Sequence, residues 1–463
     1  MPEEAESRHE RPRGYPFDAE TPQEAQAAAI LAAYPQEIEP GPADWATTGI
    51  QYFVRRDYLV AEEEYADRVR RVLGDVVANP DRDDNDDDRE RPDPDAPPDG
   101  AVTYGIEWIR LRPGVGAHRA MDLLDQRGLL ARLPEEAVNF EYVVHIAPIN
   151  TGTICPADEP EPVYSDTPLD PPVAGDRRAG AGVRVVVVDT GLDRPTALAH
   201  SWMAGVIGDP DPGVLPVNPN NPKQSNLKTY AGHGTFIAGL IRCVAPAAEV
   251  TVRAAFPPSG TAYAAKPLGL TFEWQMVRSL AQTLDDDHPD VISLSAGTRA
   301  QHGRRLTVIH RFWERKLSRY KGVVLVAAAG NDRRRTPFHP AADKWAVSAG
   351  ALSANLRNRA SFSNYGAWVD AYAPGESLVS AFPNGQLDYH EPPRKGNVGV
   401  FTTGLARWSG TSFATPILAG LIAARMSRTG EGGPDAARSM IDEARRTAIP
   451  GVGAVALPDY GTP

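Results

Sequence analysis

Residues 183–193 read VRVVVVDTGLD, and this stretch decides the fold of the larger part of the chain. A β-branched run that stays apolar up to Asp189 is typical of a strand buried on both faces. Comparable runs lie at 249–254, 290–295, 322–330 and 345–350, with helical patterns at 271–285 and 304–320. Buried strands that alternate with helices predict an α/β domain over residues 182–448, built as a doubly wound, mostly parallel sheet with helices on both faces.

A small α+β N-terminal domain is expected before it, at residues 49–148. Strand patterns lie at 49–55, 101–111 and 139–148, and helical patterns lie at 61–76 and 116–127. The remaining segments are expected to be an N-terminal extension (1–48, partly disordered but with a short helix near its Ala/Gln-rich stretch), a Pro/Asp/Gly-rich connector (149–181) and a C-terminal tail (449–463).

The acidity of the chain is concentrated at its front. The 463 residues carry a net charge of −12, yet residues 1–100 hold 26 acidic and 11 basic side chains, so the rest is close to neutral. Residues 81–100 alone hold ten acids and four prolines, which predicts a disordered, solvated loop inside the small domain. Calcium binding there is the alternative, but the loop lacks the glycine and closing glutamate of an EF-hand. The sequence contains no basic stripe, so nucleic acid is not expected as a partner.

Targeting signals and cysteine usage favour the cytoplasm. The first residues, MPEEAESRHERPRGYPF, contain no apolar segment of a signal peptide, and no apolar run is long enough to span a membrane. Two cysteines, Cys155 and Cys243, indicate neither a disulfide framework nor a cysteine-based metal site. We therefore expect a cytoplasmic protein with no membrane partner.

Three short segments carry the chemistry. Asp189 ends the first strand of the sheet, where ligand sites of open α/β sheets gather. His233 lies in AGHGTFIAGLIRCV between two glycines that allow a close approach of another chain or a ligand, and Ser412 opens an apolar helix in WSGTSFATPILAGLIAA. Each residue taken alone has an ordinary structural explanation: a turn cap for Asp189, a helix-start histidine for His233 and an N-cap for Ser412.

Together the three residues predict nucleophilic catalysis. A serine hydroxyl needs a base to accept its proton, and the base needs a carboxylate that fixes its tautomer and stabilises its cation. Asn331, in VAAAGND after another apolar strand, could donate its amide to an oxyanion together with the backbone N–H of Ser412.

The order Asp, His, Ser with DTGLD, GHGTFIAG and GTSFATP resembles the subtilisin-like (subtilase) serine peptidases. DVISLSAG at 290–297 and FSNYGAWVDAYAPG at 362–375 are similar to further stretches of that family, so the resemblance covers about residues 180–448. It implies a serine endopeptidase acting on a protein or peptide substrate without a cofactor. It further implies that Asp189 orients His233, that His233 is general base and then general acid, that Ser412 forms the acyl-enzyme, and that Asn331 holds the oxyanion.

The resemblance also implies a pocket for the residue before the scissile bond. One wall would be Ser295, Ala296 and Gly297, and the other Ala328, Ala329 and Gly330. Because these residues are small and carry no acid, we expect a roomy apolar pocket without a preference for Lys or Arg. The Pro/Asn-rich stretch 209–226 is expected to be a surface insertion near the cleft. No compact acidic cluster lies in the catalytic body, so no metal is expected.

The role of the small domain stays open between three readings. It could be a propeptide, with the connector 149–181 passing through the active site and being cut. It could remain attached as an adaptor or inhibitory lid, or be a packed accessory domain. A regulatory partner protein is a further open expectation, and the oligomeric state is not predicted.

Two other functions remain as alternatives to an endopeptidase. A catalytically silent binding protein would be expected to lack a triad member, and none is missing. A peptide ligase or cyclase on the same scaffold would differ only in whether water or an amine meets the acyl-enzyme. Cys243 lies in an apolar helical run and is expected to be a buried, inert thiol rather than a rival nucleophile.

Overall fold

The computed structural model describes residues 22–78, 97, 100, 102–146, 158–164, 171–221, 224–256 and 269–460. Most of the acidic loop 81–100 and part of the connector 149–181, including Cys155, lie outside these ranges. None of the helices in the described part is both long and apolar enough to cross a bilayer.

The larger part of the chain is a parallel sheet of seven strands in the order β14-β13-β12-β11-β7-β9-β8. Every neighbouring pair in it is parallel. The strands are β7 (Arg184–Asp189), β8 (Ile207–Gly208), β9 (Glu249–Ala254), β11 (Val291–Leu294), β12 (Val324–Ala328), β13 (Val347–Leu352) and β14 (Ala371–Pro374). The inner strand β7 has its four valines fully or almost fully buried, because helices cover both of its faces.

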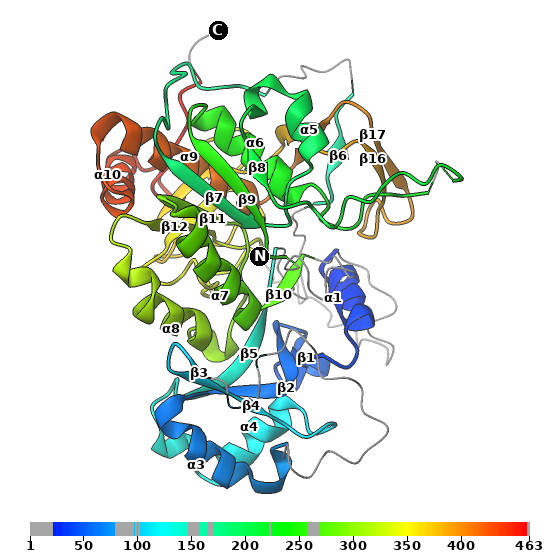
Figure 1. Cartoon of the computed structure of the whole chain (residues 1–463), viewed down its shortest axis with the longest axis vertical. Helices are drawn as coiled ribbons and strands as arrows, with labels where there is room; N and C mark the ends of the chain where they lie inside the picture. Colours follow the sequence, from blue (N-terminus) through cyan, green and yellow to red (C-terminus); the bar gives the residue numbers. More distant parts are fainter. Residues whose placement is uncertain are drawn as a thin grey trace, which may run out of the picture.

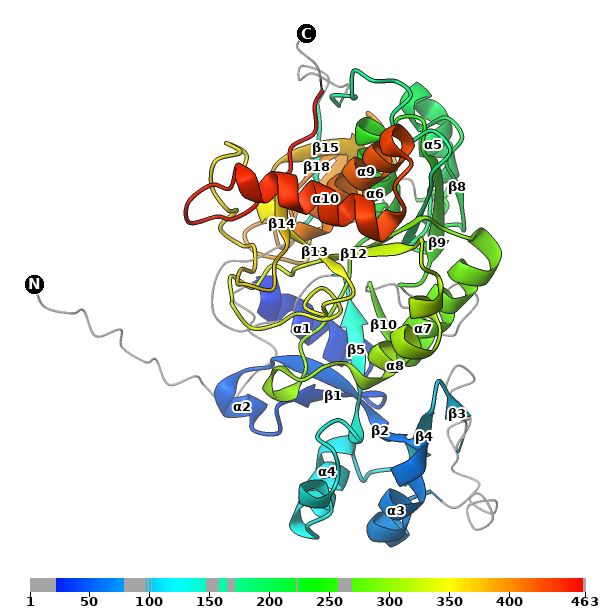
Figure 2. The same cartoon turned by 90° about the vertical axis from the view of Figure 1, so that its left-hand side faces the viewer.

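Helices lie on both sides of this sheet (Figures 1 and 2). On one side α6 (His233–Val244) packs on β7 and β9, α9 (Thr411–Thr429) packs on β11 to β14, and α10 (Gly433–Arg446) packs on α9. On the other side lie α7 (Glu273–Gln282) and α8 (Thr307–Arg315). The predicted doubly wound α/β fold is therefore confirmed.

Smaller elements complete this part of the chain. They are α5 (Arg194–Ala199), the three-stranded antiparallel sheet β15-β18-β6 and the hairpin β16-β17. Their strands are β6 (Glu161–Pro162), β15 (Leu378–Ala381), β16 (Gly385–Asp388), β17 (Val398–Phe401) and β18 (Leu405–Trp408). The C-terminal tail is not separate from the fold, since Val455 pairs with Tyr372 at the edge of the large sheet.

The N-terminal domain is an antiparallel sheet with four α-helices among its described residues, and it begins earlier than expected. Its elements are α1 (Pro22–Ala33), β1 (Ile38–Gly41), α2 (Trp45–Thr48), β2 (Tyr52–Glu62), α3 (Glu63–Leu73), β3 (Val102–Thr103), β4 (Ile106–Arg110), α4 (Ala117–Gln126) and β5 (Val138–His145). Strand β1 pairs with β2, so a domain boundary at residue 49 would separate two paired strands.

This sheet continues into the larger part of the chain. Strand β10 (Leu270–Phe272) precedes α7 in sequence, yet it pairs antiparallel with β5. Residues 271–272, expected to be helical, are therefore strand. The sheet order is β10-β5-β2-β4-β3, and in both views β5 runs up towards the larger sheet (Figures 1 and 2). The last strand of the small domain thus leads directly to the carboxyl ends of the parallel strands.

Two buried glutamates join the two parts. The Glu273 carboxylate, at the start of α7, accepts hydrogen bonds from the backbone N–H of Tyr142 in β5 (3.0 Å) and of Ile309 in α8 (3.4 Å). The Glu141 carboxylate of β5 accepts one from the N–H of Trp274 in α7 (3.2 Å). Each part therefore caps free N–H groups that the other would leave exposed.

Candidate active site

The site forms where the order of the strands reverses. Strand β7 lies between β11 and β9, and the crevice at the carboxyl ends of such strands is the usual ligand site of an open α/β sheet. Asp189 is the last residue of β7, His233 the first of α6, and Ser412 the second of α9. All three side chains are fully buried in the chain as it stands.

Asp189 and His233 form a direct pair. The Nδ1 atom of His233 lies 2.8 Å from Oδ1 of Asp189, and the same oxygen accepts the backbone N–H of Thr190 at 2.8 Å. The imidazole also contacts the rings of Trp408 and Phe413, with centroids 5.2 and 5.3 Å away. Carboxylate and aromatic rings together hold the ring in one orientation.

The two glycines beside His233 allow close backbone packing. A Cβ atom at Gly234 would lie 2.4 Å from the carbonyl oxygen of Gly191, and one at Gly232 would lie 2.4 Å from Cδ of Pro383. Gly232 also has φ of +78°, which favours glycine. The glycines on either side of His233 therefore make room for neighbouring loops of the same chain.

The sequence analysis missed Asp211, which supports this pair from behind. Its carboxylate accepts hydrogen bonds from the N–H of Gly232 (2.8 Å) and of Gly213 (2.7 Å) and from the hydroxyl of Thr190 (3.0 Å). Burial raises the pKa of Asp211 to about 7, against the lowering effect of these hydrogen bonds. Asp211 belongs to the stretch 209–226, which was expected to be a surface insertion. Much of that stretch is exposed, but this residue is buried.

Pro416 explains how the backbone at Ser412 is held. A proline has no N–H, so the carbonyl of Ser412 four residues earlier lacks its usual helical partner. That carbonyl accepts the hydroxyl of Ser295 instead, at 2.7 Å. The predicted pocket residue Ser295 therefore also anchors the start of α9.

Asn331 is oriented by Thr411. Its Oδ1 atom accepts both the backbone N–H and the hydroxyl of Thr411, each at 2.8 Å, and the same hydroxyl accepts the N–H of Gly330 at 3.1 Å. Because the amide oxygen must face these donors, the amide nitrogen faces the other way. Thr411, another residue the sequence analysis missed, thus fixes which group Asn331 presents.

The Ser412 hydroxyl does not meet the imidazole in this arrangement. Its Oγ atom lies 3.4 Å from the carbonyl oxygen of Ser295 and 3.5 Å from that of Ile146. The Nε2 atom of His233 is buried and has no hydrogen-bond partner among the described residues. No hydrogen bond therefore joins the serine hydroxyl to the imidazole in this structure.

The end of β5 lies against the site as an added strand. His145 exchanges two backbone hydrogen bonds with Gly297, both 3.1 Å long, and the N–H of Ile146 donates to the carbonyl of Gly269 at 2.8 Å. Residues 143–146 thus run between β10 and the segment after β11. Burial, together with the charge of Arg299, lowers the pKa of His145 to about 3, so the imidazole is neutral here.

The predicted pocket walls lie at adjacent strand ends. Ser295, Ala296 and Gly297 follow β11, and Ala328, Ala329 and Gly330 end or follow β12, its parallel neighbour. The ring of Phe338 lies against both walls: a Cβ atom at Gly297 would lie 2.4 Å from its Cε1 atom, and one at Gly330 would lie 3.0 Å from its Cγ atom. Cys243 is buried in α6, as the sequence predicts, and burial raises the pKa of its thiol to about 12.

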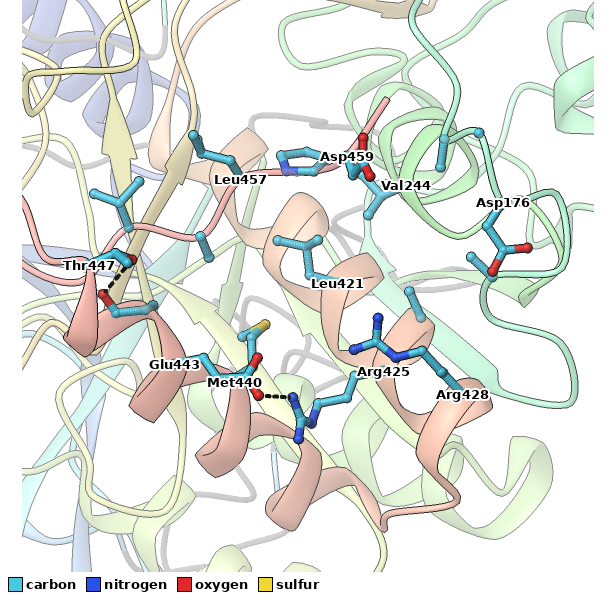
Figure 3. A pocket seen from close by; sticks show the side chains of 18 of the residues that line it. Asp176, Val244, Leu421, Arg425, Arg428, Met440, Glu443, Thr447, Leu457 and Asp459 are labelled. Atoms are coloured by element: carbon cyan, nitrogen blue, oxygen red, sulfur yellow. Dashed lines mark hydrogen bonds and ion pairs between the residues drawn. The ribbon is translucent and has the colours of Figure 1, made fainter. Parts of the chain in front are cut away.

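A hollow of about 660 Å³ lies elsewhere, between α9, α10 and the C-terminal segment (Figure 3). Its charged lining includes Arg425, which pairs with Glu443 at 2.8 Å. None of the predicted site residues lines it. Within the described residues no group of three or more His, Cys, Asp and Glu side chains could hold a metal, and the expectation that none is needed stays a prediction.

Known proteins resemble this chain over half of its length or more. Thermitase of Thermoactinomyces vulgaris is 30% identical over 261 residues, which cover 56% of this chain and 80% of thermitase. Subtilisin Savinase of Lederbergia lenta is 31% identical over 53% of this chain and 76% of its own. Fervidolysin from Fervidobacterium pennivorans, a keratinolytic enzyme related to subtilisin, shares the fold with a TM-score of 0.52 at 16% identity, over 88% of this chain and 61% of fervidolysin.

Residues 180–454 match the Subtilase family of peptidases. This match spans more than half of the chain, includes every predicted site residue and agrees with the parallel sheet described above. The chain therefore belongs to the subtilase family and is a subtilisin-like serine endopeptidase.

Proposed function

We propose that Ser412 is the nucleophile of this endopeptidase and that His233 is its general base and then its general acid. Asp189 orients the imidazole and stabilises the imidazolium cation. The 2.8 Å contact between Asp189 and His233 supports the last role, since it leaves Nε2 as the free nitrogen. Ser412 reaches that nitrogen by rotating away from the carbonyls of Ser295 and Ile146. Contacts between catalytic groups are commonly loose until a substrate is bound for reaction.

The oxyanion of the tetrahedral intermediate is held by two donors. One is the amide of Asn331, whose nitrogen side is set by the Thr411 contacts. The other is the backbone N–H of Ser412, which is among the first N–H groups of α9 and has no helical partner. Both are fixed before the substrate arrives, so no reorganisation is needed as the charge develops.

The substrate is an extended stretch of protein or peptide. The position of Ile146 carries this proposal: the chain's own strand β5 ends with a carbonyl oxygen 3.5 Å from the Ser412 hydroxyl. Upstream of it, backbone hydrogen bonds to Gly297 and Gly269 hold the strand on both edges. Recognition through main-chain groups accepts any sequence able to extend, with selectivity left to side-chain pockets.

The N-terminal domain is therefore an intramolecular inhibitor. Its last strand fills the cleft that a substrate strand needs, and two buried glutamates tie it to α7 and α8. Of the three readings, this favours a propeptide or inhibitory lid over a mere accessory domain. Cleavage shortly after Ile146 distinguishes the propeptide from the lid.

Labelling with a fluorophosphonate serine probe tests the proposal. We expect the chain to be labelled and to hydrolyse unfolded proteins, and we expect both properties to vanish in Ser412→Ala. Ser409→Ala is the matched control, since this serine lies three residues away in the same segment and has no proposed catalytic role. Equal labelling of the parent and the Ser412→Ala variant would refute the proposal. Products joined to an added amine, in place of hydrolysed ones, would favour a ligase.

A further inference from the structure

The crevice beside Ser412 has two parallel walls. Strands β11 and β12 are hydrogen-bonded neighbours, and residues 295–297 and 328–330 continue them past the sheet. The Ser412 Oγ atom lies 3.4 Å from the carbonyl of Ser295, on the first wall. A substrate residue that is cut at this hydroxyl is therefore expected to place its side chain near the gap between the walls.

Phe338 occupies that gap. A Cβ atom at Gly297 would lie 2.4 Å from Cε1 of Phe338, and one at Gly330 would lie 3.0 Å from its Cγ. The phenyl ring thus touches the glycine of each wall at once. Only 2% of Phe338 is exposed while the strand of the N-terminal domain fills the cleft.

The backbone of Phe338 is fixed from several sides. The next residue, His339, exchanges two backbone hydrogen bonds with Thr298, of 2.8 and 2.9 Å. The carbonyl of Phe338 accepts the N–H of Ala342 at 2.9 Å. The ring cannot leave the gap by a shift of its loop without breaking these contacts.

We propose that Phe338 closes the pocket for the residue before the scissile bond, so that the enzyme selects Gly, Ala or Ser there and rejects Phe, Tyr and Leu. This inference rests on the proposed function. The physical reason is close packing: a large side chain would have to displace a buried aromatic ring held between two backbones. The smallness of the wall residues, which suggested a roomy pocket, instead makes room for Phe338.

Peptide substrates that differ only in this residue, through the series Gly, Ala, Val, Leu and Phe, test the proposal. We expect kcat/KM to be at least about 100-fold higher for Ala than for Phe, the size of effect a pocket too small by several methylenes produces. Phe338→Ala is expected to raise kcat/KM for Phe and Leu at least tenfold relative to that for Ala. The ratio of two such constants on one preparation does not depend on how much of the enzyme is unblocked.

Control variants distinguish a failure of this inference from a failure of the proposed function. Phe338→Val serves if the alanine variant does not fold, and Phe312→Val, in α8 against Tyr104, is a matched loss of a buried ring that should not change the order of substrates. A parent enzyme that is labelled by the probe but cleaves after Phe as fast as after Ala would overturn this inference alone. A chain with no labelling and no hydrolysis would refute the proposed function and this inference with it.

Discussion

The carbonyl oxygen of Ile146 lies 3.5 Å from the hydroxyl oxygen of Ser412, although 266 positions separate the two residues in the chain. The contact brings the last residue described in the N-terminal domain to the proposed nucleophile. It is formed because β5 pairs with β10 on one side and with Gly297 on the other. The first prediction follows from it.

Purified parent protein should cut itself within the few residues that follow Ile146. The released fragment should end shortly after Ile146, since that residue already lies beside Ser412 and the pocket proposed above does not admit an isoleucine side chain. Intact-mass spectrometry measures the fragment, and Ser412→Ala should stay whole. A fragment ending inside β4 or α4, or equal cleavage in Ser412→Ala, would contradict the prediction.

Asn331→Ala should lower kcat about 100- to 1000-fold, the usual cost of losing one oxyanion donor. KM should change little, because the amide acts on charge that develops only in the transition state. Steady-state kinetics on a peptide substrate measures both constants. Asn358→Ala, in an exposed turn, is the matched control. A large rise in KM with unchanged kcat would instead indicate a substrate-binding role.

The stability of the joined domains should fall as the pH rises above 6.5. Burial raises the pKa of Glu273 to about 8, helped by the nearby Glu141, while an unfolded glutamate titrates near 4.5. Unfolding therefore releases a proton between these values, and stability decreases with rising pH by at most about 1.4 kcal/mol per pH unit. Thermal unfolding of the uncut Ser412→Ala chain from pH 6.5 to 8 measures the slope.

Adding Glu273→Gln should flatten that slope, although the variant should also be less stable at pH 6.5 because one backbone N–H loses its acceptor. Adding Asp442→Asn, on an exposed part of α10, should leave the slope unchanged. The same slope in the Glu273→Gln variant would show that this carboxyl does not control the pH dependence.

His145 should act in the opposite direction in acid. Its pKa is lowered to about 3 by burial and by Arg299, whereas a free histidine titrates near 6.5. Between these values the unfolded chain binds the extra proton, so this group's contribution to stability is lost as the pH falls below 6.5. On the Ser412→Ala background, the parent should lose stability relative to His145→Gln between pH 6.5 and 5, while His390→Gln should behave like the parent. No divergence in thermal unfolding would contradict this.

Gly234→Ala should destabilise the protein by about 2–4 kcal/mol, because its Cβ atom would lie 2.4 Å from the carbonyl oxygen of Gly191 and backbone must move. Gly322→Ala should stay within about 1 kcal/mol of the parent, since nothing lies within 4 Å of its Cβ position. Urea unfolding measures both. Equal stability of the two variants would show that the loop of Gly191 yields more easily than proposed.

Local patterns were enough for much of the fold and for the proposed catalytic residues. The valines of β7 predict a strand buried on both faces, and β9 runs over the six residues expected of it. Each of the motifs around Asp189, His233 and Ser412 covers a single strand end or helix start, so a few consecutive residues are enough to show it. Such features depend on neighbours in the sequence, so a single chain is sufficient to recognise them.

Other features follow only from contacts between distant segments. Nothing local to Leu270–Phe272 says that it completes the sheet of the N-terminal domain, and nothing local to Asp211 says that it is buried behind His233. The proposed pocket shows the difference most clearly: its small wall residues suggested open space, but Phe338 lies against the glycine of each wall. Sequence periodicity records which side of an element is buried, but which residue fills a given space depends on how remote segments pack in three dimensions.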